Sequence, residues 1–128
     1  MDRACFACGP DNPNGLKLTI EPSAEGVTAR FVPADWTQGY HGIVHGGIIC
    51  TLLDEIAVWA AHRIGHYAAT GEINVRFKHS MKVGKVYRCN GRITAVKNPL
   101  ALAESEIVDE RGAVIAQARV KLIKIEHR

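Results

Sequence analysis

The fold is decided by one stretch of the sequence, Gly39-Tyr40-His41-Gly42-Ile43-Val44-His45-Gly46-Gly47-Ile48-Ile49-Cys50-Thr51-Leu52-Leu53-Asp54-Glu55. A His-Gly-Gly triplet opens a segment whose spacing predicts a long apolar helix, and the carboxylate of Asp54 follows inside it. Backbone N–H groups at a helix start have no intrahelical partner, and glycines let a ligand approach them. A carboxylate in an apolar helix is unfavourable unless it is paired or functional. The stretch therefore indicates an oxyanion-binding helix end with a base nearby, an arrangement for attack on a carbonyl.

The predicted helix runs from about Gly46 to Ile64. Asp54 falls on a flank of mostly small residues, which indicates a second close contact, for which another subunit is a candidate. Glu55 falls on the opposite flank, nearer solvent, where a surface or ion-pair role is expected. The stripe that is predicted to face the core consists of Ile49, Leu52, Leu53, Ile56, Ala57, Ala60 and Ile64.

Residues on both sides of this helix alternate between apolar and polar, which is typical of strands. The expected strands cover residues 16–20 and 27–31 before the helix, then a segment from residue 72, 86–96, 101–108 and 113–125. Residues 1–15 are rich in turn-forming residues and predict an irregular lead-in. One long helix on an antiparallel sheet of about six strands is an α+β layer architecture. No linker or repeat divides the 128 residues, so one domain over residues 1–128 is expected.

Composition and charge exclude several classes of protein. A net charge of +3 is too mild to argue for a nucleic-acid partner. No stretch reaches the ~18 uncharged apolar residues of a membrane span, so no membrane partner is expected. The first residues lack a signal-peptide pattern, which predicts a cytoplasmic location.

The four cysteines are expected to be reduced thiols in such a location. Cys5 and Cys8 have the spacing of half a zinc site, but a full site needs a second pair. Cys50 and Cys89 stand alone, and no carboxylate or cysteine cluster completes the histidine pairs in the sequence. No metal site is therefore expected, and the Cys5–Cys8 segment is interpreted as a turn packed on the domain.

Motifs along nearly the whole chain match a known family. They are Cys5-Phe-x-Cys8-Gly9, Asn12-Pro13-x-Gly15-Leu16-x-Leu18, Gln38-Gly39, His45-Gly46-Gly47-x5-Leu53-Asp54-Glu55, Asn74-Val75-Arg76-Phe77 and Val83-Gly84. On these motifs the chain resembles the hotdog-fold acyl-CoA thioesterases, specifically the phenylacetyl-CoA thioesterase-like branch. The resemblance implies a sheet wrapped around the central helix and subunits joined edge to edge as a homodimer or homotetramer. It also implies an active site at the dimer interface, an acyl-CoA substrate and no cofactor.

The resemblance carries catalytic roles over to particular residues. The family's carboxylate matches Asp54, and its oxyanion N–H matches Gly46. A hydroxyl residue near the start of the third strand, which the partner subunit contributes in some members, matches Thr70. Some relatives carry Asn six residues before the histidine. That position is Gly39 here, and Gln38 beside it is the candidate to orient the attacking water or the thioester.

Other residues complete the expected site. His45, just before the helix, is expected to cap it or orient the loop rather than act as a base. Gly47 is expected to leave room for the thioester. The candidates for binding coenzyme A phosphates are Arg76, Lys78, Lys82 and Lys97, with an ordinary solvated sheet face as the alternative.

The leading interpretation is an acyl-CoA thioesterase that hydrolyses a thioester to a free acid and coenzyme A. Asp54 would act either as a general base on water or as a nucleophile that forms an anhydride, and the sequence does not separate these routes. One alternative is an acyl-thioester hydratase or dehydratase, in which His45 and an acid shuttle protons. Another alternative is a non-catalytic acyl-CoA binding protein.

Overall fold

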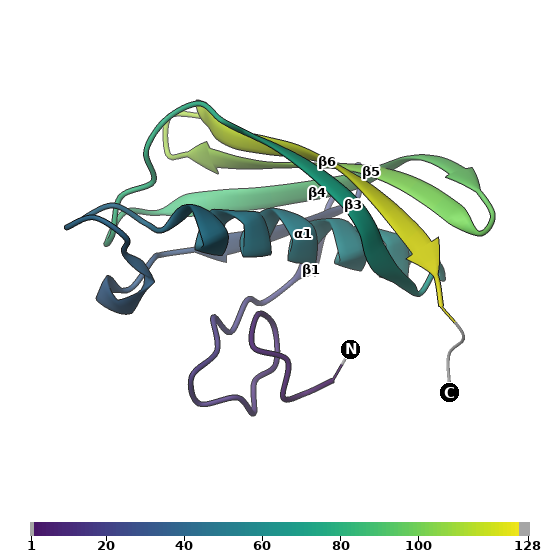
Figure 1. The fold of residues 1–128 in the computed structure, drawn as a ribbon, viewed down its shortest axis with the longest axis horizontal. Helices are drawn as coiled ribbons and strands as arrows, with labels where there is room; N and C mark the ends of the chain where they lie inside the picture. The colour runs from purple at the N-terminus through teal and green to yellow at the C-terminus, as the bar shows by residue number, and fades with distance from the viewer. Residues whose placement is uncertain (1, 126–128) are drawn as a thin grey trace.

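The computed structural model describes residues 2–125, in which an antiparallel six-stranded sheet lies across one long helix (Figure 1). The elements are β1 (Glu21–Pro22), β2 (Val27–Phe31), η1 (Asp35–Thr37), α1 (Gly46–Arg63), β3 (Ala68–Phe77), β4 (Tyr87–Lys97), β5 (Leu100–Asp109) and β6 (Val114–Lys124). The strands follow one another across the sheet as β1-β2-β4-β5-β6-β3. The predicted α+β class and the order of strands, helix and strands are confirmed. No helix among residues 2–125 has the length and apolarity needed to cross a bilayer.

Helix α1 packs its apolar stripe against the inner face of the sheet. Leu52, Leu53 and Ile56 are completely buried, as the helical spacing predicts. The prediction for Ile64 is wrong, because its side chain is 55% exposed and Ala61 is buried instead. The cause is the end of the helix. Arg63 is its last residue, and Gly65 follows with a φ of +80°, which turns the chain away from the core.

The predicted strand over residues 16–20 is also wrong. Its alternation is genuine, but its backbone groups bond elsewhere: Leu16 N donates to Phe6 O at 2.6 Å and Leu18 N donates to Ala7 O at 2.9 Å. Only Glu21–Pro22 pair with β2. The N-terminal segment has therefore taken the hydrogen bonds that the sheet would have used. This segment lies on the side of α1 away from the sheet (Figure 1).

Strand β3 forms one edge of the sheet. It pairs with β6, and within residues 2–125 no strand pairs with its other edge. It begins at Ala68, four residues before the position that alternation predicted. An unpaired edge of ten residues is a template for pairing with another chain.

Candidate active site

The first turn of α1 leaves one backbone donor open. Gly47 N donates to His45 Nδ1 at 2.8 Å, and the N–H groups of Ile48 and Ile49 both donate to the carbonyl of His45. The N–H of Gly46 has no hydrogen-bond partner in the part of the chain that the structure describes. It lies at the positive end of the helix dipole, where it can bind a developing negative charge.

A shallow, open pocket of about 510 Å³ lies at this helix start. Its lining residues are Ile43, Val44, Gly46, Ile49, Phe77, Lys78, His79, Ser80 and Met81. The walls combine apolar side chains with polar ones, and the basic residues Lys78 and His79 come from the segment that follows β3. A Cβ added to Gly46 would meet only the Phe77 ring, at 3.7 Å. Sequence reasoning missed Phe77 and Met81 as site residues, because strand alternation does not show which strand end meets the helix start.

The contacts of His45 are those of a helix cap. Its Nδ1 accepts the Gly47 N–H, so in the neutral ring the proton is on Nε2. A Cβ on Gly47 would come within 3.1 Å of the same nitrogen. The absence of a side chain at Gly47 therefore makes room for the His45 ring. The sequence suggested a different reason for this glycine, namely room for a thioester.

Asp54 makes its hydrogen bond within its own chain. The Thr70 hydroxyl donates to Asp54 Oδ1 at 2.5 Å, and both residues are partly buried. This corrects the expectation that Thr70 reaches the carboxylate from a partner subunit. Burial and the charge of Asp54 raise the pKa of the neighbouring Cys50 thiol, which disfavours its thiolate form.

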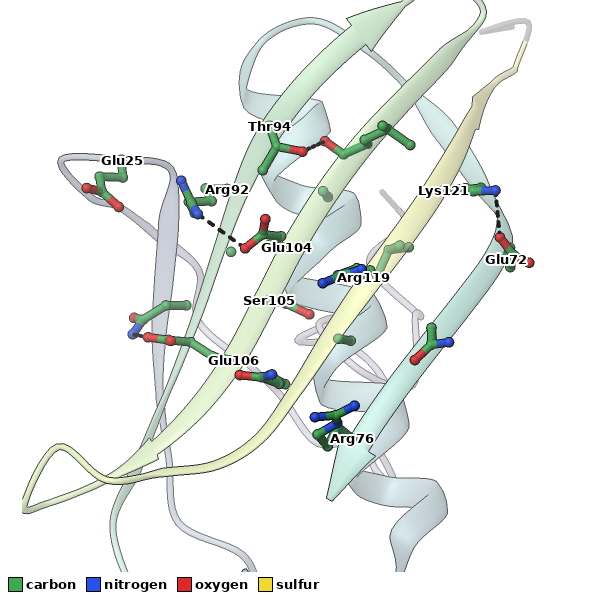
Figure 2. Close-up of a pocket in the computed structure, with 18 of the residues that line it drawn as sticks. Glu25, Glu72, Arg76, Arg92, Thr94, Glu104, Ser105, Glu106, Arg119 and Lys121 are labelled. Atoms are coloured by element: carbon green, nitrogen blue, oxygen red, sulfur yellow. Dashed lines mark hydrogen bonds and ion pairs between the residues drawn. The ribbon is translucent and has the colours of Figure 1, made fainter. Parts of the chain in front are cut away.

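A β-bulge turns Thr70 toward the helix. The pairing of β3 with β6 shifts register between Thr70 and Glu72, which leaves Gly71 as an extra residue. Beyond the bulge, Glu72 and Arg76 point into a groove on the outer face of the sheet (Figure 2). Regular alternation would put Thr70, another even-numbered position, on that outer face too. The extra residue reverses the alternation and brings the hydroxyl to Asp54.

Gly46 and Asp54 lie too far apart to act on one carbonyl within a single chain. Both belong to α1, and eight residues at about 1.5 Å each separate them by about 12 Å along the axis. A reacting carbonyl must lie about 3 Å from both its nucleophile and its oxyanion donor. Within one chain, therefore, these two groups cannot both contact the same carbonyl.

The remaining predicted site residues do not gather in one place. Gln38 Oε1 accepts the Gly42 N–H at 2.9 Å, so this amide braces the loop before α1. Lys78 lines the cavity beside Gly46, and Lys82 is held nearby through a bridge between its backbone and Ile43. Arg76 points into the outer groove instead (Figure 2).

Lys97 lies far from these residues. Its partner in β5 is Leu100, which pairs with Ile123 of β6, and Ile123 pairs with Ala69 at the start of β3. Lys97 is therefore at the opposite end of the sheet from Lys78. The phosphate candidates of the sequence analysis do not form one patch within a chain.

The environment of Glu55 differs from the expected solvated flank. Its Oε1 accepts from Trp59 Nε1 at 3.1 Å, and Cys5 Sγ lies 3.8 Å from the same oxygen. Burial, reinforced by the Glu55 carboxylate, raises the pKa of the Cys8 thiol to about 12. The N-terminal segment covers this flank of α1. Helical periodicity does not predict this contact, because the covering residues lie about fifty positions away in the sequence.

Comparison with known proteins places these features in a family. Residues 41–116 match the family model described as the thioesterase superfamily. Over 69 residues the chain is 29% identical to the acyl-coenzyme A thioesterase THEM5 of Mus musculus. This aligned region covers 54% of this chain and 28% of that protein. This chain therefore spans less than a third of the length of that relative.

Solved structures show the same fold. Another thioesterase superfamily protein superposes with a TM-score of 0.90 at 21% identity, over 95% of this chain and 61% of that one. A hypothetical thioesterase from Streptococcus pneumoniae, solved with coenzyme A, superposes with a TM-score of 0.80 at 20% identity, over 87% of this chain and 88% of that one. Two further structures are mutants of a hypothetical thioesterase from the same organism. In one, alanine replaces an aspartate, and in the other, alanine replaces a threonine that lies sixteen residues after that aspartate. These likenesses establish the hotdog fold.

Proposed function

Because the chain belongs to the thioesterase superfamily, we propose that it hydrolyses the thioester of an acyl-CoA to a free acid and coenzyme A. The observation that carries this proposal is the open N–H of Gly46, a residue that lines an open pocket of about 510 Å³ at the positive end of a helix. A thioester carbonyl that accepts this hydrogen bond is polarised, and its oxyanion is stabilised as water or a carboxylate attacks.

Asp54 supplies the attacking group or activates it. The Thr70 hydroxyl occupies Asp54 Oδ1, which fixes the carboxylate and leaves Oδ2 for a water molecule or for the carbonyl carbon. The two alanine substitutions in the Streptococcus pneumoniae protein support this pair, because they are separated by the same sixteen residues as Asp54 and Thr70. His45, whose Nδ1 is engaged at the helix start, acts by holding that start in place.

The complete site takes Gly46 from one subunit and Asp54 with Thr70 from another. The 12 Å separation along α1, about twice what one carbonyl can bridge, supports this arrangement. A second copy that pairs antiparallel with the open edge of β3 would also lay its α1 antiparallel to the first. Cys50 lies midway between Gly46 and Asp54, so a two-fold axis near Cys50 brings each Gly46 to the other chain's Asp54.

Coenzyme A binds next to the same helix start. The solved complex of the Streptococcus pneumoniae thioesterase with coenzyme A supports this class of ligand. Lys78 lines the cavity and Lys82 lies close to it, so we assign the phosphates to these two ammonium groups. Arg76 and Lys97 point to other parts of the chain's surface and are left out of the proposed site.

The activity is tested by thiol release from short, long and aromatic acyl-CoAs, with the products identified by mass. Free coenzyme A and the free acid are the expected products. An altered double bond in an intact thioester would instead indicate a hydratase or dehydratase. Tight binding of every acyl-CoA without turnover would indicate a binding protein.

Two inactive variants should restore activity when they are combined. We expect Gly46→Pro and Asp54→Asn to be nearly inactive when each is expressed alone. If they are co-expressed in equal amounts and pair at random, about a quarter of the sites receive an intact Gly46 and an intact Asp54 from different chains. The measurement is specific activity in thiol release. Activity no higher than the mean of the two separate variants would contradict a site shared between subunits.

Thr70 should affect turnover through its hydroxyl. Thr70→Val keeps the shape but removes the hydrogen bond to Asp54, and such bonds to a charged group are worth about 1.5–3 kcal/mol. We therefore expect kcat to fall about 10–100-fold. Thr70→Ser keeps the donor and should stay close to the wild-type rate. Equal kcat values for the two variants would remove Thr70 from the mechanism.

A further inference from the structure

Two thiols and a carboxylate come together on a flank of α1 that the proposed reaction does not use. Cys5 and Cys8 come from the N-terminal segment, and Glu55 comes from the helix. The sulfur atoms and one carboxylate oxygen all lie within 4.8 Å of one another. The sequence places these groups about fifty residues apart, so only the fold brings them together.

The spacing of the three atoms fits a single small cation. Zinc binds sulfur at about 2.3 Å and carboxylate oxygen at about 2.0–2.2 Å in tetrahedral sites. Two such ligands are then about 3.5–3.8 Å apart. The distance from Cys5 Sγ to Glu55 Oε1 is 3.8 Å, which matches a pair of ligands better than it matches a strong hydrogen bond.

The charge of Glu55 is not compensated. The carboxylate is partly buried, and its described contacts are the Trp59 indole N–H and the two thiols. The ion pairs found within residues 2–125 are Arg3–Asp11, Arg92–Glu104 and Lys121–Glu72, so no cationic side chain pairs with Glu55 there. A withdrawn carboxylate is unfavourable without a cation, and a bound metal would supply one.

The turn that carries the thiols has a fixed shape. Gly9 N donates to Cys5 O at 2.8 Å, and a Cβ on Gly9 would overlap the backbone around Arg3 and Cys5. Leu16 and Leu18 bond to the backbone of the intervening residues Phe6 and Ala7. The backbone that carries both thiols is thus braced from both sides, and a turn that is already formed favours binding.

We propose that Cys5, Cys8 and Glu55 bind a thiophilic divalent cation, for which Zn²⁺ is the best match, with water as the fourth ligand. Binding forms two metal–sulfur bonds and releases one proton from each thiol. The sequence expectation of no metal required a second cysteine pair, but Cys89 is buried in the core and Cys50 lies elsewhere on α1. The carboxylate of Glu55 takes the place of that pair. The cation ties the N-terminal segment to the helix that carries Asp54.

Cobalt binding to the full chain tests the proposal. The reduced, chelator-treated protein is titrated with Co²⁺, and we expect about one equivalent to give thiolate charge-transfer and tetrahedral d–d absorption. Zn²⁺ should displace the cobalt and raise the melting temperature. Cys5→Ser should lose both absorption bands, whereas Cys50→Ser is the matched control and should keep them.

Glu55→Gln separates the carboxylate from the thiols. The amide oxygen can still accept the Trp59 N–H, so this variant should fold, yet it should bind the cation at least about tenfold more weakly. Wild-type protein that is folded and reduced but gives no thiolate charge-transfer band would overturn the proposal. Equal loss of binding in Cys5→Ser and Cys50→Ser, or full affinity in Glu55→Gln, would overturn it as well.

Discussion

Asp54→Asn should lower kcat by a factor on the order of 10²–10⁴ while leaving the fold intact, since that is the scale of general base catalysis. The amide keeps the shape of the carboxylate and still accepts the Thr70 hydroxyl, so the contact recorded between these side chains survives. What is lost is the basic and nucleophilic oxygen. Thiol release at saturating acyl-CoA measures the effect.

The matched control is a carboxylate that lies away from the proposed site. Glu104 pairs with Arg92 on the outer face of the sheet (Figure 2), and Glu104→Gln should keep the wild-type rate. Both variants should have melting temperatures close to that of the wild type. An Asp54→Asn protein that retains more than about half its activity would exclude Asp54 as the base or the nucleophile.

Gly46→Pro should lower kcat by about 10²–10³, the scale of loss when one oxyanion donor is removed. Proline has no backbone N–H, and the first position of a helix tolerates it well. Gly46 is that position, and His45 before it has φ −60° and ψ 137°, an extended conformation that suits a residue preceding proline. The variant therefore deletes the open donor with little cost to the helix.

Gly46→Ala is the control for this experiment, because it adds a methyl group but keeps the N–H. The added carbon would lie 3.7 Å from the Phe77 ring, an ordinary contact. We expect Gly46→Ala to fold normally and to lose less activity than Gly46→Pro. If the proline variant folds and turns over at the wild-type rate, the oxyanion is bound elsewhere.

Sequence periodicity was sufficient for the helix and for most of the strands, but not for every element or contact. The helical spacing from Ile49 to Ala60 fixed the buried face of α1, and alternation located most of the strands. Alternation failed at residues 16–20, where the N-terminal segment competes for the backbone hydrogen bonds. Such competition between distant segments leaves no periodic trace.

The candidate site likewise has features that the sequence predicted and features that only the structure shows. The His45-Gly46-Gly47 triplet indicated the helix start, but its open donor emerges only when the partners of each N–H are known. The partner of Asp54 within its own chain depended on an irregular residue in β3. The cluster of Cys5, Cys8 and Glu55 needed the fold, because neither spacing nor helical phase joins those positions.

Because Gly71 is an extra residue in β3, the face on which the Thr70 hydroxyl lies depends on the number of residues in the strand and not on which residues they are. Exchanging one side chain for another along β3 leaves that count unchanged, whereas removing a single residue would rotate the hydroxyl to the opposite face of the sheet. When homologues are aligned, a one-residue gap at this point would therefore mark a chain without the Asp54 contact, even if its threonine is retained. Insertions and deletions in β3 are then informative about chemistry, where they would ordinarily be dismissed as variation in length.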